Sequence, residues 1–296
     1  MVKGKLNLDL YESIALMKAL AKKFFLKQEY HPLIFKSKGL EFEGYRKYER
    51  ADDASLIDWK ASQRTQELMI RKFKQERELQ IAFIVDAGSN MIFGSTEKLK
   101  CEYAAELTAA MATLIIDSNN LLGYLFFSDK AGEFRNFFQG QKNLNIFYDK
   151  LANGETYGGA SNINSALDYA INYFNKDVST IFLVSDFLNL DNDSIRKLQL
   201  LSQRLDIVAF KINDPIDKEL PDISEEIFIQ DPNSNRQLLV NPKIAKKQYD
   251  SYSKNKHETI KRCLRDSGVD VIEFNTKESF VHPMALFLKK RMYQVM

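Results

Sequence analysis

Apolar runs of strand length alternate along the chain with segments in which apolar residues recur every three or four positions. The continuous apolar runs cover residues 80–86, 121–127, 180–185, 205–212 and 269–274. A run that is apolar throughout indicates a strand covered on both faces, as in a parallel sheet. Helical spacing is found between and after these runs, at residues 96–117, 144–151, 162–174, 193–204, 244–267 and 283–292.

Alternating strands and helices require crossover connections, so the pattern predicts an α/β fold with a doubly wound, mostly parallel sheet over residues 80–296. Residues 133–138 are expected to add an edge strand. A hairpin insertion is expected at about residues 225–241, around a turn-rich loop. Residues 1–79 are expected to form a separate, small N-terminal element that contains a helix at residues 10–26 and an irregular or β segment.

Composition places the chain among globular proteins, because 45% of the residues are apolar and 12% are aromatic. Residues 1–10 lack the apolar stretch of a signal peptide, and no apolar run approaches the length of a membrane span. The two cysteines, Cys101 and Cys263, do not suggest a disulfide framework and are expected to be buried thiols. We therefore expect a cytoplasmic protein. A net charge of +2, with acids mixed among the bases, predicts no nucleic-acid partner.

Polar side chains gather where the predicted strands end. Asp86-Ala-Gly-Ser-Asn90 follows one strand, Ser185-Asp186 ends another, and Gly158-Gly-Ala-Ser-Asn162 precedes a helix. In open parallel sheets such groups meet beyond the carboxyl ends of the strands. Hard oxygen ligands of this kind suit Mg²⁺ or another divalent cation.

These loops resemble the metal-ion-dependent adhesion site of von Willebrand factor A domains, which has the pattern Asp-x-Ser-x-Ser, a threonine and a later aspartate. The resemblance implies metal ligands at Asp86, Asn90, Ser161 and Asp186. The site is degenerate, because Gly88 stands at the first serine position and Ser89 is one position out of register. In the alternative interpretation, Asp86 and Asp186 only cap loops and accept hydrogen bonds.

A second resemblance lies further towards the N-terminus. The segments that carry it are Gly39-Leu-Glu-Phe-Glu-Gly-Tyr-Arg-Lys-Tyr48, Ala51-Asp-Asp53, Leu56-Ile-Asp-Trp-Lys-Ala-Ser62 and Arg64-Thr65. They are similar to the signature of the family known as domain of unknown function 58, with Ala51 in place of a usual glycine. The similarity extends over roughly residues 36 to 290, and it implies a von Willebrand factor A-like domain after the signature.

The signature segment has two physical interpretations. Its aromatic residues are candidates for anchors that pack on the sheet domain, and these are Phe42, Tyr45, Tyr48 and Trp59. Its charged residues are candidates for a charge-assisted network, and these are Arg46, Asp52, Asp53, Asp58 and Arg64. The alternative, which is compatible with the first, is a surface that faces a partner.

An enzyme is not expected, and no catalytic residue is assigned. The strongest catalytic alternative is a metal-dependent nuclease that uses Asp58 and Lys60, which have the acid-x-Lys spacing of such sites. It requires both residues on a strand, with an upstream acid close to Asp58. The sequence contains no GxSxG, GxxxxGK[ST] or HExxH motif.

The resemblance implies a function as an interaction protein. Family members of this kind are usually encountered beside MoxR-type AAA+ ATPases, so it implies an adaptor for such an ATPase in chaperone-like assembly of protein complexes. Its substrates would include membrane or envelope proteins. A stand-alone scaffold or homo-oligomer remains the alternative.

Overall fold

A computed structural model describes residues 4–24, 41–49, 52, 54–74, 78–223, 225–230 and 237–295 of the 296-residue chain. The chain divides into two compact units. We call residues 1–36 together with 79–296 the sheet unit, and residues 37–78 the small unit.

The sheet unit is built on six strands in the order β10-β7-β6-β3-β4-β5. Five are parallel, and only the edge strand β5 runs antiparallel, against β4. Their bounds are β3 Gln80–Asp86, β4 Leu121–Phe127, β5 Arg135–Phe138, β6 Val178–Ser185, β7 Asp206–Asn213 and β10 Asp270–Asn275. The α/β fold class with a mostly parallel sheet that the sequence predicts is confirmed, since each predicted apolar run is a strand of this sheet.

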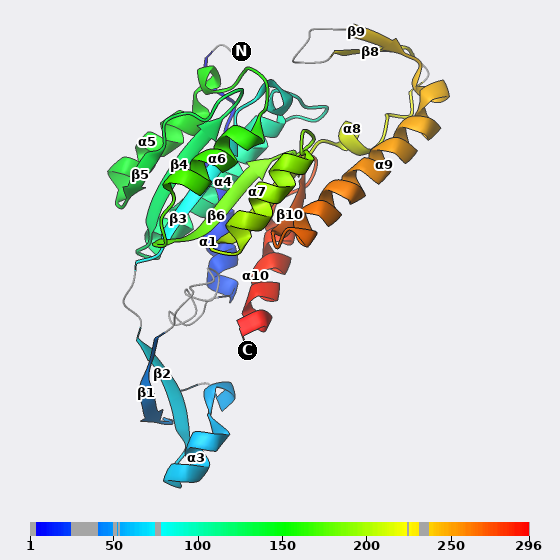
Figure 1. Cartoon of the computed structure of the whole chain (residues 1–296). Coiled ribbons are helices and arrows are strands. Elements are labelled where there is room, and N and C mark those ends of the chain that lie inside the picture. The colour runs from blue at the N-terminus through cyan, green and yellow to red at the C-terminus, as the bar shows by residue number, and fades with distance from the viewer. Residues whose placement is uncertain are drawn as a thin grey trace. The chain divides into compact units, whose positions relative to one another are not determined.

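Helices cover both faces of the sheet (Figure 1). On one side lie α1 Leu10–Phe24, α4 Lys100–Asp117, α5 Gln141–Ala152 and α10 Val281–Val295. On the other lie α6 Ile163–Tyr173, α7 Asn192–Ser202 and α9 Pro242–Asp266. Alternate residues of β3 enter the two cores: Phe83 packs in the first and Ile84 in the second, and both are fully buried. The continuous apolar runs therefore reflect burial on both faces.

The helix at the N-terminus packs differently from our expectation. We expected residues 1–79 to form one element, but α1 belongs to the sheet unit, where Met17 and Leu20 are buried in the same core as α4. The backbone N–H of Asp9 also donates to Glu106 Oε1 on α4, at 2.6 Å. The amphipathic pattern of α1 indicates an apolar face, but it does not specify which surface that face covers.

The small unit contains an antiparallel pair, β1 Glu41–Lys47 and β2 Met69–Lys74, with the 3₁₀ turn η2 Ala54–Leu56 and the helix α3 Trp59–Thr65 between them. Asp58 is the N-cap of α3, and its Oδ1 accepts from the backbone N–H groups of Lys60 and Ala61 at 3.0 and 3.1 Å. Arg46 pairs with Asp52 through two hydrogen bonds of 2.6 and 2.8 Å.

The expected hairpin is present as β8 Ile227–Gln230 and β9 Gln237–Val240, which pair antiparallel, and its connecting residues 231–236 lie outside the described part. It leads into α9, which ends before Gly268 at φ +77°, a conformation that glycine adopts without strain. The remaining short elements are η3 Ser89–Met91, η4 Gly154–Thr156 and α8 Pro215–Lys218.

Two further expectations are settled by burial and length. Cys101 is fully buried, whereas Cys263 is only partly buried, so one of the two thiols is less enclosed than expected. Within the described residues, no helix combines the length and apolarity needed to cross a bilayer.

Candidate functional site

The carboxylate of Asp86 lies at the end of β3 and is fully buried. Its Oδ1 accepts the backbone N–H of Gly88 at 2.8 Å. Its Oδ2 accepts three side-chain donors: Ser185 Oγ at 2.7 Å, Ser161 Oγ at 2.8 Å and Asn90 Nδ2 at 3.1 Å. Both oxygens of Asp86 are therefore committed to bonds within the protein, and they join three loops at the carboxyl edge of the sheet.

The carboxylate of Asp186 lies next to that of Asp86 and is bound by a lysine. Lys100 Nζ, at the start of α4, donates to Asp186 Oδ2 at 2.8 Å and to Asp217 Oδ2 at 3.3 Å. Lys100 and Asp186 are each only 2% exposed. The other oxygen, Asp186 Oδ1, accepts the backbone N–H of Leu188 at 3.0 Å. The two strand-end aspartates thus have different partners, hydroxyls for Asp86 and an ammonium for Asp186.

This arrangement separates the pKa values of the two aspartates. Burial, together with the negative charge of Asp186, raises the pKa of Asp86 above its ordinary value. Burial also acts to raise the pKa of Asp186, but the adjacent Lys100 ammonium overrides it and holds that pKa below the ordinary value. For Lys100, burial acts to lower the pKa, and the charges of Asp186 and Asp217 reverse this, so the pKa is raised. Lys100 and Asp186 are therefore a buried ion pair.

The four predicted metal ligands are brought together as the sequence predicted. Asn90 and Ser161 donate directly to Asp86, and the Asn90 amide also acts to lower the pKa of Asp186. Ser89 lies outside the group of donors to Asp86, and its backbone N–H donates to Gly159 O at 2.8 Å. One feature favours an additional ligand, because Asn90 Oδ1 is buried and has no hydrogen-bond partner among the described residues.

The donor set as a whole does not fit a divalent cation well. Mg²⁺ and Ca²⁺ need several free oxygen ligands, whereas Asp86 Oδ2 already accepts three donors and Asp186 Oδ2 holds Lys100. Within the described residues, no group of three or more His, Cys, Asp or Glu side chains is placed to hold a metal ion. A cation on Asp86, Asn90, Ser161 and Asp186 therefore stays a prediction, and the geometry argues against it.

The packing around Gly88 accounts for the absence of the first serine of the metal-ion-dependent adhesion site motif. A Cβ atom at this position would lie 2.5 Å from Asn90 Oδ1 and 2.8 Å from Ser161 Cβ. Contacts this short are not tolerated without movement of the neighbours. The loop therefore packs against Asn90 and Ser161 so closely that it has room for glycine alone.

A second aspartate cluster, which the sequence did not predict, supports the same loops. Asp214 follows β7 and accepts hydrogen bonds from the backbone and hydroxyl of Ser95, from Ile216 N at 3.0 Å and from Thr276 Oγ1 at 3.1 Å. Asp217 then links this turn to Lys100, since its Oδ2 accepts both the Asp214 N–H at 2.9 Å and the Lys100 ammonium. Lys100, Asp214 and Asp217 complete the site.

One of these missed residues would leave a signal in the sequence only if the helix were known to begin at Lys100 rather than at residue 96, where the pattern places it. A lysine in the first turn of a helix is unfavourable next to the positive end of the helix dipole, so Lys100 calls for a compensating acid. The acids that compensate it, Asp186 and Asp217, are 86 and 117 residues away. Such distant partners are not evident from local spacing.

The small unit does not have the geometry that the nuclease hypothesis requires. Asp58 and Lys60 are the N-cap and second residue of α3 rather than strand residues. The carboxylate of Asp58 is held by the helix N–H groups, with Tyr45 Oη at 3.5 Å. A helix N-cap is a structural role, so the nuclease alternative is not supported.

The aromatic and charged residues of the small unit are only partly as expected. Trp59 is 67% exposed and Tyr45 46% exposed, and their expected packing on the sheet domain stays a prediction. The expected charge network is present as the Arg46–Asp52 pair, whereas Asp58 serves as a cap. The side chain of Phe42 and residue Asp53 lie outside the described part.

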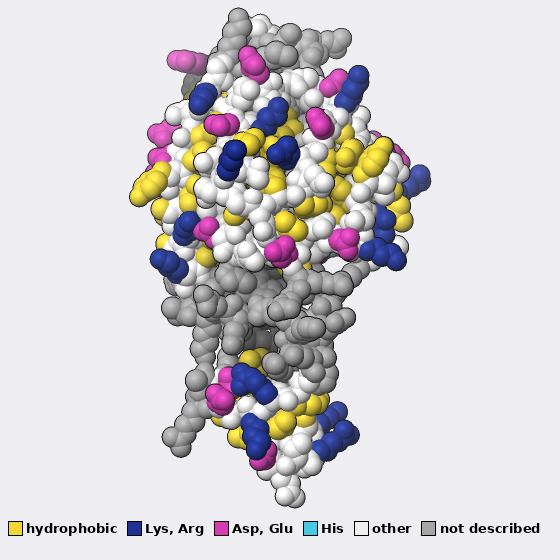
Figure 2. All heavy atoms as spheres, turned by 90° about the vertical axis from the view of Figure 1, so that its left-hand side faces the viewer, with side chains coloured by type: hydrophobic (Ala, Val, Ile, Leu, Met, Phe, Trp, Pro, Cys, Tyr) yellow, Lys and Arg dark blue, Asp and Glu magenta, His cyan; other side chains and the backbone are white. Residues whose placement is uncertain are grey.

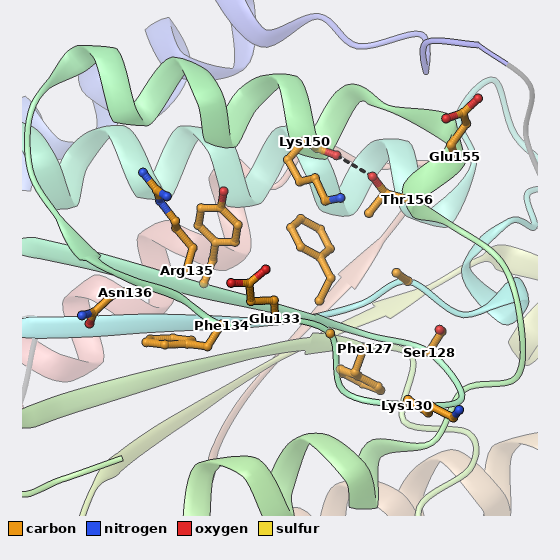
Figure 3. Close-up of a pocket in the computed structure, with 14 residues that line it drawn as sticks. Phe127, Ser128, Lys130, Glu133, Phe134, Arg135, Asn136, Lys150, Glu155 and Thr156 are labelled. Carbon is orange, nitrogen blue, oxygen red and sulfur yellow. Dashed lines mark hydrogen bonds between the residues drawn. The ribbon is translucent and has the colours of Figure 1, made fainter. Parts of the chain in front are cut away.

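A pocket of about 640 Å³ lies beside the Asp86 loop, between α5 and the β4–β5 connection. Tyr124 and Phe126 of β4 lie side by side in its lining, with ring centroids 5.8 Å apart. Lys150 extends from α5, and Glu133 and Arg135 come from the opposite side (Figure 3). Within the described residues, these three charged side chains make no ion pair with the protein. Figure 2 views this side of the sheet unit, where apolar side chains lie between charges of both signs.

Comparison with known proteins shows the family and a shared fold. Residues 44–259 match the family described as "Protein of unknown function DUF58". The chain belongs to the DUF58 family. The match begins within the small unit and ends in α9, so the matched region includes parts of both units.

Relatives of this DUF58 chain include uncharacterized proteins of Mycobacterium bovis (Mb1516) and Mycobacterium tuberculosis (Rv1480). Each is 24% identical over 250 residues, which is 83% of this chain and 78% of the relative. Among solved structures, the conserved hypothetical protein BatB from Bacteroides thetaiotaomicron aligns with 73% of this chain and 99% of its own, at a TM-score of 0.51 and 12% identity. A von Willebrand factor type A protein from Catenulispora acidiphila covers 75% of this chain and 43% of its own, at a TM-score of 0.43 and 11% identity. At such low identity the BatB alignment shows a shared fold only.

Proposed function

We propose that this DUF58 chain is a non-enzymatic, cytoplasmic adaptor that binds a MoxR-type AAA+ ATPase and links it to substrate proteins, which include membrane or envelope proteins. Nucleic acid has no part in this function. Family membership supports the proposal, because the signature in residues 39–65 resembles that of proteins encountered beside such ATPases. The adaptor would contribute binding surfaces, while the ATPase would supply the energy for assembly of protein complexes.

The observation that best supports the proposal is an open pocket. It lies beside loops whose buried carboxylates already have hydrogen-bond partners within the protein. Asp86 and Asp186 have protein partners, so these carboxylates are engaged in structure rather than poised for chemistry. In the pocket, by contrast, Lys150, Arg135 and Glu133 are exposed and have no ion-pair partner in the described chain. Unpaired charge around an aromatic surface is what a peptide-binding pocket needs.

The pocket also indicates which kind of segment it binds. Tyr124 and Phe126 can receive an apolar side chain, and Lys150 and Arg135 can each pair with a carboxylate next to it. Glu133 can accept a backbone N–H of the same segment or pair with a basic group. The volume of about 640 Å³ accommodates one or two side chains. We therefore assign this pocket to a partner segment in which an acidic residue neighbours an apolar one.

The small unit offers a second contact surface. Trp59 is 67% exposed, and Tyr45, Leu56 and Leu68 are 46%, 42% and 45% exposed. Exposed tryptophan and tyrosine are the side chains that most often dominate binding energy at protein interfaces. This surface falls within and directly after the family signature, which fits the interpretation of that signature as partner-facing.

The test is a pull-down of the purified chain with the MoxR-type ATPase of the same organism, with and without EDTA. The unmodified chain should retain the ATPase under both conditions. Lys150→Glu reverses one pocket charge and should lower recovery about tenfold, the effect of losing one well-formed charged contact. Lys142→Glu is the matched control, because Lys142 is an exposed lysine of the same helix that does not line the pocket.

Each remaining outcome has a defined meaning. If no ATPase is recovered under either condition, the adaptor proposal fails. Light scattering then tests the alternative, since a stand-alone homo-oligomer would show a mass that is a multiple of 34.3 kDa. If Lys142→Glu and Lys150→Glu lower recovery equally, the pocket is not the contact. Trp59→Ala tests the second surface in the same assay.

A further inference from the structure

Lys100 occupies a position where its charge needs an explanation. It is the first residue of α4, where the helix dipole already disfavours a positive charge, and it is 2% exposed, so it also loses its hydration. Its ammonium lies 2.8 Å from Asp186 Oδ2, 3.3 Å from Asp217 Oδ2 and 5.6 Å from the centre of the Phe93 ring. A lysine held in this way is stable only because it compensates negative charge that is buried at the same point.

The negative charge at this point comes from the strand ends. Asp86 and Asp186 are adjacent and buried, and Asp217 lies on the other side of the ammonium. Adjacent buried carboxylates repel each other and require a cation between or beside them. In the complete metal-ion-dependent adhesion site, which this chain resembles, a divalent cation would fill this role. Here a side chain of the protein does so.

We infer that Lys100 is a built-in cation that takes the place of the divalent ion, so that the loops at the carboxyl edge of the sheet assemble without metal. A metal ion on Asp186 Oδ2 would have to displace the ammonium from its closest partner. Lys100 would then remain buried beside a second positive charge, which is strongly unfavourable. The Oδ2 atom of Asp86 could become a ligand only by releasing hydrogen bonds from Ser161 and Ser185.

The surrounding contacts agree with this inference. The Lys100 backbone N–H donates to Phe93 O at 2.8 Å, which fixes the chain where the loop after Asp86 enters α4. Asp217 both receives Lys100 and caps the turn that starts at Asp214. One lysine thus joins the loops that follow β3, β6 and β7, and the first two of these carry the predicted metal ligands Asp86, Asn90 and Asp186. The inference concerns the loops next to the proposed interface, and it does not depend on any partner.

The experiment measures Tm of the full chain in millimolar MgCl₂, MnCl₂ or EDTA, together with Mn²⁺ binding followed by electron paramagnetic resonance. The unmodified chain should show the same Tm in all three solutions and no Mn²⁺ binding at millimolar concentration. Lys100→Met should have a lower Tm in EDTA and regain about 3 °C or more in MnCl₂ or MgCl₂, because Asp186 and Asp217, which have lost their ammonium partner, now take a metal ion. Lys100→Gln tests the same point if Lys100→Met does not fold.

The matched control is Lys211→Met, since Lys211 is another fully buried lysine of the sheet unit, and its ammonium makes its hydrogen bonds with Asn213 and His257 rather than with Asp186 or Asp217. Its loss of stability should not be recovered by metal. A metal-dependent Tm or Mn²⁺ binding in the unmodified chain would overturn the inference. Folded Lys100 variants that gain nothing from metal would also overturn it and leave an ordinary ion pair. These results need no ATPase, so they stand apart from the outcome of the pull-down.

Discussion

The ammonium of Lys211 lies 2.6 Å from Nδ1 of His257, and this contact joins β7 to α9 in the interior of the sheet unit. His257 Nε2 lies 2.9 Å from the carbonyl oxygen of Asp217. Because the ammonium donates to Nδ1, the proton of the neutral ring is on Nε2 and is donated to Asp217. The imidazole is therefore held neutral. Burial, and then the charge of Lys211, lower the pKa of His257 to about 4, while burial lowers the pKa of Lys211 to about 8.

The first prediction is a loss of stability in mild acid that depends on His257. The folded pKa of about 4 lies below the ordinary value of 6.5, so the unfolded chain takes up this proton first. Stability from this group is complete above the unfolded pKa and is lost as pH falls from about 6.5 to about 4, by about 1–3 kcal/mol. Urea unfolding at pH 7 and pH 4.5 should show a smaller difference for His257→Gln than for the unmodified chain.

The control for this measurement is His282→Gln, because His282 is exposed on α10. Its pH dependence should equal that of the unmodified chain. If His257→Gln loses as much stability between pH 7 and pH 4.5 as the unmodified chain, other groups cause the acid sensitivity.

The second prediction concerns Gly88, where the family motif has serine. Gly88→Ser should destabilise the chain by about 1–3 kcal/mol, because its Cβ would lie 2.5 Å from Asn90 Oδ1 and force the loop apart. Thermal unfolding followed by circular dichroism measures this loss. Ala160→Ser, at an exposed position in the facing loop, should change stability by less than about 0.5 kcal/mol. If Gly88→Ser is as stable as Ala160→Ser, the loop is not packed as tightly as described.

The third prediction compares the loss of stability caused by two substitutions of Asp86, to alanine and to asparagine. Asp86→Ala removes the acceptor of Ser161, Ser185 and Asn90 and should cost about 2–4 kcal/mol, since buried donors lose their partner. Asp86→Asn retains one carbonyl oxygen for the two hydroxyls and should cost less. Urea titration compares the two. Asp129→Ala, an exposed aspartate near the same edge, should have little effect, and a loss of equal size there would contradict the assignment.

The sheet could be predicted from the sequence because each strand is apolar on both faces, as Phe83 and Ile84 show. The meeting of Asp86 with Ser161 and Asp186 was also predictable, since parallel strands end at one edge. The role of Lys100 was not. Its helix was expected to begin at residue 96, but α4 begins at Lys100, and the preceding loop is held instead by Ser95 on Asp214. That contact spans 119 residues, so tertiary structure rather than local pattern sets where α4 starts.

The fourth prediction concerns Arg291, which attaches α10 to two strands of the sheet. It is 1% exposed and lies 2.7 Å from Asp206 Oδ2 on β7 and 2.7 Å from Asp270 Oδ2 on β10. Truncation removes the guanidinium from two mostly enclosed carboxylates, Asp206 at 7% and Asp270 at 19% side-chain exposure, so Arg291→Met should cost about 3–5 kcal/mol. Arg291→Lys should recover only part of this, because an ammonium cannot bind Asp206 through two parallel hydrogen bonds as the guanidinium does.

Lys290 provides the control for this prediction. It is the neighbouring residue and also pairs with Asp270, at 3.1 Å, but its side chain is 58% exposed. An exposed ion pair is weakened by solvent and salt, so Lys290→Met should cost less than about 0.5 kcal/mol. Urea unfolding at low and high NaCl concentration distinguishes the two, since the Arg291 effect should persist in salt. A cost for Arg291→Met no larger than that for Lys290→Met would show that α10 is held by its apolar contacts alone.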